Sequence, residues 1–450
     1  MSGKMKIFHA VFGALVFAFG LSFCCGCKDG KESGNNQHEW PKPPANCPHF
    51  TQDYTLPQTQ SAGQLATFME TEHLDYSLDG WFFFGSLEDS AAPDDLEVFF
   101  IAVQRIDMLG EAFGAQQVPA VVAFNNKSLG KYEFGGFYEL DVDPFMVVKS
   151  DPWSVELFSP FQEEPLITME TVSGRMGEAG AVYLLKADIT PDFQGFRFRA
   201  EIRLRDRYGA INQGYGSASF FPQFLTPEQR ALITKFFGGS VQAYLESTGD
   251  PMACQGSFYY TLPLLDVEQF TIMRGDTLLS SGAGGLMWLD YIVQTYDQQA
   301  MDVVVKDGSW QFFAIQLPEE NAAIMVLQVN GLYGSLPVAT LFRYDSDRTR
   351  NLARKPAHSW GIDEIKIEPN PNNIWVSPDT GLSYHMQYRI RLGSGDHSAD
   401  LFIKMAHPNQ EVVIDPQKIK YEGLGAVEGM LEGFPVTGQV FLEVQPAGKF

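Results

Sequence analysis

The stretch 196–205, FRFRAEIRLR, alternates between apolar and charged side chains over its whole length. Apolar residues occupy every second position, and four arginines and one glutamate fill the positions between them. Successive side chains of a β-strand point to opposite faces of a sheet, so this period of two predicts a half-buried antiparallel strand. Similar aromatic and β-branched runs, broken by turn residues, are LEVFFIAVQRI (96–106), AAIMVLQVNGLYG (322–334) and SYHMQYRIRL (383–392). The chain is therefore predicted to be mainly β.

One segment has the features of a helix instead, TPEQRALITKFFGGSVQAYLES at 226–247. Thr226 can cap the first turn, Pro227 suits the first helical position, and Gln229 follows the cap by three residues. The sequence predicts a helical insertion here, within the first β-domain.

Two β-domains in tandem are predicted from the length and from an internal similarity. Roughly 400 residues follow the N-terminal segment, more than one hydrophobic core usually contains. WFFFGSLED (81–89) and WQFFAIQLPE (310–319) both place a Phe pair two and three residues after Trp, and an apolar strand containing Gln follows each. Duplication of a small β-barrel explains the similarity, and chance resemblance between aromatic strands is the alternative. We predict domains at 54–298 and 299–450.

The N-terminal end has the layout of a secretory signal peptide, because two lysines precede an apolar run at 7–23. A bacterial lipoprotein signal ends directly before a cysteine that receives the lipid. Cys27 follows a glycine but lacks the aliphatic residue expected three positions earlier, whereas Cys24 has that residue but follows a phenylalanine. An ordinary signal with incidental cysteines is the remaining alternative. We predict a lipoprotein-type signal at 1–27, export, and a lipid anchor in the bacterial cell envelope.

The segment 28–53 is polar and Pro-rich, so it is predicted to be a flexible tether. If Cys27 carries the lipid, Cys47 and Cys254 are the two cysteines left in the mature chain. An even pair in an oxidising compartment is a candidate disulfide, and two free thiols are the alternative.

Charge and motifs argue against several classes of function. The formal net charge of -23 and the lack of a basic stripe oppose nucleic-acid binding. The sequence has no nucleophile elbow, Walker loop, dinucleotide fingerprint, zinc-protease motif or EF-hand, so we predict no metal and no cofactor. One basic segment, 343–355, is either a solvated loop or a docking site for anionic head groups or a partner.

The apolar stretch GAGGLMWLDYIV at 282–293 contains one carboxylate, Asp290. An unpaired charge inside a core is energetically expensive. Asp290 is therefore either a structural acid with satisfied hydrogen bonds or a group that faces a cavity.

Five blocks in register resemble the AttH and carotenoid hydratase (hydroxyneurosporene synthase, CrtC) family, whose members have two tandem lipocalin-like domains. The blocks are DGWFFFGSL (79–87), GSFYYTLPLL (256–265) leading to GLMWLDYIV (285–293), WQFFAIQL (310–317), WVSPDTGLSYHMQYRI (375–390) and YEGLGAVEGMLEGFPVTGQVFLEV (421–444). The resemblance implies two antiparallel lipocalin-like β-barrels and a cavity for an apolar molecule.

The sequence also departs from the family pattern. Tyr291 and Ile292 stand where the family has His and Glu, Ser86 replaces a histidine, and Asp79 is shorter than the family's acid. A general acid or base needs a titratable group at the reacting atom, so these losses disfavour catalysis.

The resemblance implies that Asp290 and Glu422 are the surviving acids of the cavity, with Tyr260 or Tyr291 as polar assistants. The alternative is that both acids pair with an arginine such as Arg389 or satisfy backbone groups. The residues expected to contact a ligand are Asp79, Trp81, Ser86, Tyr260, Trp288, Tyr291, Trp310 and Arg389.

Two functions remain open. The first is a non-catalytic, lipid-anchored carrier of a hydrophobic small molecule, with an ABC-type transporter as the partner that the AttH resemblance implies. The second is a cofactor-independent hydratase, isomerase or cyclase that acts on a terpenoid- or polyketide-like substrate by carboxylate acid–base catalysis.

Overall fold

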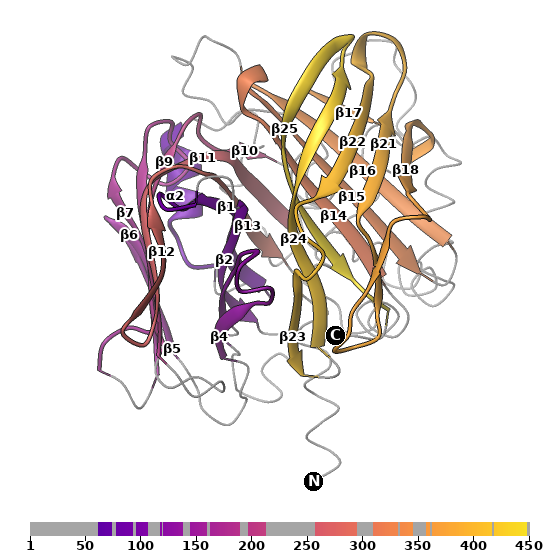
Figure 1. Ribbon diagram of the computed structural model, residues 1–450. Coiled ribbons are helices and arrows are strands. Elements are labelled where there is room, and N and C mark those ends of the chain that lie inside the picture. Colours follow the sequence, from indigo (N-terminus) through magenta and orange to yellow (C-terminus); the bar gives the residue numbers. More distant parts are fainter. Residues whose placement is uncertain are drawn as a thin grey trace, which may run out of the picture.

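The computed structural model describes residues 62–73, 78–92, 96–106, 118, 120–137, 145–159, 163–189, 197–212, 257–294, 309–331, 334–344, 357–360, 362–415 and 418–447. Its strands form two large antiparallel sheets, which Figure 1 shows as two bodies side by side. The helix α2 (Ala62–Met69) accompanies the first sheet. Within the described ranges, no helix is long and apolar enough to cross a membrane.

The first sheet is built around the long strand β11, which pairs with β13 along one half and with β9 along the other. The strand order is β4-β3-β2-β1-β13-β11-β9-β8-β7-β6-β5, and β10 and β12 also pair with β11. The strands are β1 (Leu78–Glu88), β2 (Leu96–Ile106), β3 (Ala120–Asn125), β4 (Glu133–Phe137), β5 (Phe145–Ser150), β6 (Trp153–Phe158), β7 (Ile167–Ser173), β8 (Val182–Ile189), β9 (Phe198–Asp206), β10 (Ile211–Asn212), β11 (Ser257–Arg274), β12 (Thr277–Gly282) and β13 (Leu286–Gln294).

The alternating stretch at 196–205 forms β9, as predicted. The apolar side chains of β9 belong to the core of the first sheet, and its arginines lie on the outer face. Arg203 and Arg205 both pair with Glu268, at 3.0 and 2.5 Å. The register of β11 against β9 shifts at Glu268, so a β-bulge places this carboxylate between the two arginines.

The second sheet has the strand order β17-β16-β15-β14-β25-β24-β22-β21-β18, and β23 also pairs with β24. Its strands are β14 (Ser309–Leu317), β15 (Ala322–Gly331), β16 (Gly334–Arg343), β17 (His358–Trp360), β18 (Ile365–Pro369), β21 (Gln387–Leu392), β22 (Ala399–Met405), β23 (Glu411–Asp415), β24 (Lys418–Leu431) and β25 (Phe434–Gln445). A separate hairpin joins β19 (Ile374–Val376) to β20 (Ser383–His385), and the 3-10 helices are η5 (Pro318–Glu320), η6 (Ile362–Glu364) and η7 (Gly395–His397).

The two strands that share the Trp-Phe-Phe pattern occupy the same place in their sheets. β1 lies between β2 and β13, the last strand of the first sheet, and β14 lies between β15 and β25, the last strand of the second. Glycine permits the close contact of first and last strand in both cases. A Cβ at Gly85 would lie 2.2 Å from the Leu286 carbonyl oxygen, and a Cβ at Gly438 would lie 2.0 Å from that of Gln316.

The matched side chains nevertheless point to opposite faces. Trp81 and Phe83 belong to the core of the first sheet. In the second sheet the core contains Phe313 and not Trp310 or Phe312. Side chains alternate along a strand, so a shift of one residue exchanges the buried and outer faces. The aligned pattern therefore identifies equivalent strands but not equivalent side chains.

The two sheets contact each other through the outer faces of β1 and β13. The Phe84 ring lies 4.5 Å from the Phe441 ring and 6.2 Å from the Phe312 ring, measured between centroids. The Gln316 amide donates to the Met287 carbonyl at 3.0 Å. This contact is apolar at its centre and is also tied by hydrogen bonds.

Several predictions concern residues outside the described ranges. These are the signal at 1–27, the tether at 28–53, the helix at 226–247, the domain boundary at 298 and 299, and the cysteines at 24, 27, 47 and 254. The helix α2 was not predicted, although Ser61 followed by Gln64 matches a capping box. Its apolar side chains Ala66 and Met69 are fully buried, so tertiary packing stabilises a helix of only eight residues.

Candidate functional site

A group of polar side chains lies inside the first sheet beneath α2. We call it the Asp79 cluster; it consists of His73, Asp79, Arg105, Tyr260 and Tyr291. β1, β2, β11 and β13 supply four of these residues, and His73 follows α2. Alternation along β1 places Asp79 on the same face as Trp81, so the strand that packs the core also carries the carboxyl inward.

The Asp79 carboxyl is fully buried, and this burial raises its pKa to about 7. The backbone N–H of His73 donates to the carboxyl at 2.8 Å, and this bond, the positive charge of Arg105 and the Tyr291 hydroxyl each lower the pKa in part. Loss of water around the carboxylate outweighs these favourable contacts. Asp79 can therefore exchange a proton near neutral pH.

The segment that contains α2 covers this cluster. The Phe68 ring lies 5.6 Å from the Tyr260 ring and 6.3 Å from the Tyr291 ring, and the Phe68 carbonyl lies 2.9 Å from Nε2 of His73. The guanidinium of Arg105 donates to the His73 carbonyl. Asp79 and Arg105 therefore both form hydrogen bonds with the backbone of His73, which fixes the segment to the residues that it covers.

The segment is also held at Glu70, which directly follows α2 and has a buried carboxylate. This carboxylate accepts hydrogen bonds from Nε and Nη2 of Arg175, at 3.1 and 2.5 Å, and from the backbone N–H of Met176 at 2.9 Å. Arg175 is partly exposed, so an ion pair that reaches the surface fixes the segment just after α2.

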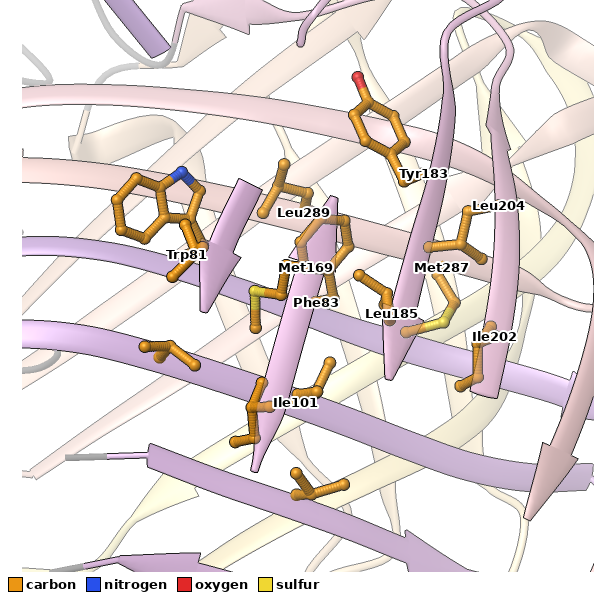
Figure 2. Packing of buried hydrophobic residues seen from close by; sticks show 14 of the residues in the cluster. Trp81, Phe83, Ile101, Met169, Tyr183, Leu185, Ile202, Leu204, Met287 and Leu289 are labelled. Carbon is orange, nitrogen blue, oxygen red and sulfur yellow. The ribbon is translucent and has the colours of Figure 1, made fainter. Parts of the chain in front are cut away.

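Aromatic side chains surround the Asp79 cluster on the core side. The Trp81 ring stacks on Tyr291 at 5.3 Å and lies 6.0 Å from the Trp153 ring, between centroids. Figure 2 shows Trp81 beside the apolar core residues of the same sheet, such as Phe83 and Leu289. The indole N–H groups of Trp81 and Trp153 are buried and have no hydrogen-bond acceptor among the described residues. The aromatic wall of this interior therefore contains two indole N–H donors that no described residue accepts from.

Asp290 lies in the same sheet on the opposite face. Its carboxylate accepts hydrogen bonds from Thr261 Oγ1 at 2.8 Å, from Trp288 Nε1 at 2.5 Å and from the Tyr259 hydroxyl. Burial raises its pKa to about 7 against these three donors, and the negative charge of Glu443 adds to the rise. Asp290 thus has satisfied hydrogen bonds, which favours the first of the two alternatives that the sequence left open, and its catalytic role stays a prediction.

Glu422 belongs to a second polar group, across the contact between the sheets. Lys420 Nζ lies 2.7 Å from Glu443 and 3.7 Å from Glu422, and Trp310 Nε1 donates to Glu443 at 2.9 Å. Burial raises the pKa of Glu422 well above its usual value, and Glu443 raises it further, against the opposing charge of Lys420. Glu422 thus pairs with a lysine, whereas the alternative considered from the sequence was an arginine such as Arg389.

The expected ligand contacts thus separate into three places. Asp79, Trp81, Tyr260 and Tyr291 come together in the first sheet. Ser86, Trp288 and Trp310 lie between the sheets, where the Ser86 hydroxyl donates to Gln439 at 2.7 Å. Arg389 lies apart from both, is 41% exposed, and pairs with Asp400 at 2.6 Å.

Sequence reasoning missed His73, Arg105 and Trp153. A signal for Arg105 was present, because it shares the period-two face of Phe99, Ile101 and Val103, which are all core residues. Nothing local marks His73 or Trp153, since their positions depend on α2 and on β6 lying against strands distant in sequence. In the described ranges, no three His, Cys, Asp or Glu side chains are placed to hold a metal ion.

Comparisons with known proteins agree with this fold. No family model and no curated protein matches the sequence. The solved structure of a candidate AttH protein from Nitrosomonas europaea is similar to this chain, with a TM-score of 0.52 and 17% identity over 84% of this chain and 95% of that one. Kievitone hydratase from Nectria haematococca aligns with a TM-score of 0.48 and 11% identity, over 81% and 88% of the two chains. The chain therefore has the AttH-like fold of two tandem lipocalin-like β-domains, which confirms the resemblance in its sequence.

Proposed function

We propose that this protein binds a predominantly apolar small molecule inside its first β-domain, at the Asp79 cluster, and acts as its carrier. One observation carries the proposal: a buried carboxyl with a pKa of about 7 lies in an aromatic interior where two indole N–H groups have no acceptor among the described residues. Ligand sites are mostly apolar with a few convergent polar groups, and this interior has that composition.

A purely structural role for the cluster explains less. Buried polar groups in native proteins are nearly always hydrogen-bonded, as the three donors to Asp290 illustrate. The aromatic rings alone would suit any packed β-barrel. A packed core alone does not explain why the indole N–H groups of Trp81 and Trp153 have no acceptor among the described residues.

The proposal is tested by native mass spectrometry of the purified protein, followed by solvent extraction and identification of any bound molecule. We expect a stoichiometric apolar compound, which Asp79→Asn depletes. Asp290→Asn is the matched control, because it makes the same change in the same sheet on the opposite face. Equal occupancy in Asp79→Asn and the unchanged protein would contradict the placement of the site.

The carrier role also rests on the proposed lipid anchor at Cys27, or at Cys24, which would hold the protein at an envelope membrane beside a transporter. Metabolic labelling with a palmitate analogue tests the anchor, and Cys27→Ser and Cys24→Ser distinguish the two positions. Label that persists in the double variant would reject both cysteines.

Acid–base catalysis is a second candidate, favoured by one observation, the Tyr291 hydroxyl beside an Asp79 carboxyl whose pKa is about 7. A general acid works best when its pKa lies near the operating pH. Here Asp79 would transfer the proton of a hydration or isomerisation, in place of Asp290. Long incubation of the extracted ligand with the protein separates the candidates: a product shifted by one water, or an isomer, indicates an enzyme, and an unchanged ligand indicates a carrier.

A further inference from the structure

The described residues include five tryptophans whose side chains are fully buried, and they differ in one respect. Three donate their indole N–H to a nearby acceptor: Trp288 to Asp290 at 2.5 Å, Trp310 to Glu443 at 2.9 Å, and Trp360 to the His397 carbonyl at 2.7 Å. The remaining two, Trp81 and Trp153, have no acceptor in the part of the chain that the structure describes.

The two exceptions are neighbours. The rings of Trp81 and Trp153 lie 6.0 Å apart between centroids, although one residue is on β1 and the other on β6. A buried donor without an acceptor costs roughly 1–3 kcal/mol, so two such donors side by side favour an acceptor at this place. Their proximity points to an acceptor supplied from outside the chain.

The charges near this place restrict the chemistry of that acceptor. The guanidinium of Arg105 is buried beside Asp79, and indole and guanidinium groups donate hydrogen bonds but cannot accept them. An ammonium group could pair with the Asp79 carboxyl but offers no acceptor to the two indole N–H groups. A carboxylate would approach the Asp79 carboxyl, which is negative above neutral pH. An uncharged oxygen satisfies the donors without either conflict.

We infer that the ligand of the Asp79 cluster carries an uncharged oxygen acceptor, such as a ketone, aldehyde or ester carbonyl, on an apolar skeleton, and that Trp81 and Trp153 donate to this oxygen. The inference rests on the proposed binding function and adds the chemical class of the ligand. An unsubstituted hydrocarbon would leave both donors without partners and would bind more weakly.

Displacement of the neutral dye N-phenyl-1-naphthylamine by matched probes tests the inference in the full-length mature protein. Farnesal, farnesylamine and α-farnesene share a C15 skeleton, and retinal, retinylamine and axerophthene share a C20 skeleton, so two ligand sizes are sampled. We expect the aldehyde of at least one set to bind about 10-fold or more tightly than its hydrocarbon and its amine, since two hydrogen bonds are gained.

Trp81→Phe and Trp153→Phe remove the N–H and keep an aromatic ring. Each should weaken aldehyde binding about 3- to 10-fold and leave hydrocarbon binding unchanged. Trp360→Phe is the matched control, because it removes a hydrogen-bonded N–H in the second sheet. It should alter neither aldehyde binding nor hydrocarbon binding. Denaturant unfolding provides a readout that is independent of ligand. Trp360→Phe leaves the His397 carbonyl without its donor, so it should lower the free energy of unfolding. Trp81→Phe and Trp153→Phe leave no acceptor of the described chain without a donor, so they should lower it less.

The outcomes distinguish failure of the inference about the ligand's oxygen from failure of the proposed binding function. Aldehyde and hydrocarbon that bind equally, or an aldehyde preference that survives in both Phe variants, would overturn the inference and leave the binding function intact. An amine preference would overturn it as well. Failure of the dye and of every probe to bind would contradict the proposed function itself, and the inference with it.

Discussion

Asp79 and Asp290 lie on the neighbouring strands β1 and β13 and face opposite sides of one sheet, yet burial raises the pKa of each to about 7. Asp290 is surrounded by three donors and faces the second sheet. Asp79 faces an aromatic interior beneath α2. The same physical cause therefore acts on two carboxyls, and only their neighbours distinguish a structural acid from a candidate ligand contact.

Both carboxyls predict a stability that decreases as the pH rises from about 4 to about 7. A raised pKa means that the folded state binds the proton more tightly than the unfolded state, so the free energy of unfolding falls as the pH rises from about 4 to about 7. We expect the midpoint of urea unfolding to be lower at pH 8 than at pH 5.5. Asp79→Asn and Asp290→Asn should each flatten this dependence.

Asp276→Asn, which makes the same change at a fully exposed carboxylate, is the control for that measurement. If Asp79→Asn and Asp290→Asn leave the slope of the unchanged protein as it is, neither carboxyl has a raised pKa in the folded state.

Asp290 is expected to matter for stability and not for ligand binding. Asp290→Ala leaves Trp288 Nε1 and the hydroxyls of Tyr259 and Thr261 without an acceptor, at a cost of roughly 2–4 kcal/mol in unfolding free energy. Asp290→Asn retains one acceptor and should cost less than half as much. Chemical denaturation measures both, and loss of bound ligand in a folded Asp290→Asn protein would contradict this assignment.

Lys420 is expected to hold the contact between the sheets together at neutral pH. Lys420→Met leaves the buried carboxylates of Glu422 and Glu443 without their cation, which should cost roughly 3–5 kcal/mol. Burial raises the pKa of Glu422, so its neutral form is more populated at pH 5 than at pH 7 and part of the loss should be restored at pH 5. Thermal unfolding at the two pH values measures the recovery.

A second substitution makes the Lys420 prediction sharper. Adding Glu443→Gln to Lys420→Met removes one of the two unpaired charges and should regain part of the stability at pH 7. If the double variant is no more stable than Lys420→Met, electrostatic pairing is not what Lys420 contributes.

The ion pair between Glu70 and Arg175 predicts a local opening of the segment above the Asp79 cluster. Arg175→Ala removes two of the three hydrogen bonds to the Glu70 carboxylate. Amide hydrogen exchange should accelerate at α2, including the Glu70 amide bonded to Ala66, and remain slow in β1 and β13. Arg203→Ala, which breaks a surface pair on β9, is the control. Uniform acceleration across the first sheet would indicate global destabilisation instead.

The sequence by itself determined the mainly β composition, the tandem repeat and the strands that open each domain. The alternation at 196–205 predicted β9 because burial of one strand face is a local property, readable at a period of two. Five weak blocks in register predicted the fold because their order and spacing reflect the topology that the solved AttH-like structure shares. The resemblance also named Asp79, Trp81, Tyr260 and Tyr291, which lie together in the structure, and their contact with a ligand stays a prediction.

Only the tertiary structure decided which face each of these residues occupies. The matched residues Trp81 and Trp310 point into different environments because a one-residue shift inverts a strand. Asp290 obtains two of its three donors from the paired strand β11, and Asp79 obtains its cover because the segment with α2 packs against β11 and β13 as well as β1. Desolvation and hydrogen bonding depend on those three-dimensional neighbours, so the sequence could name the acids but could not say which one lies in the aromatic interior beneath α2.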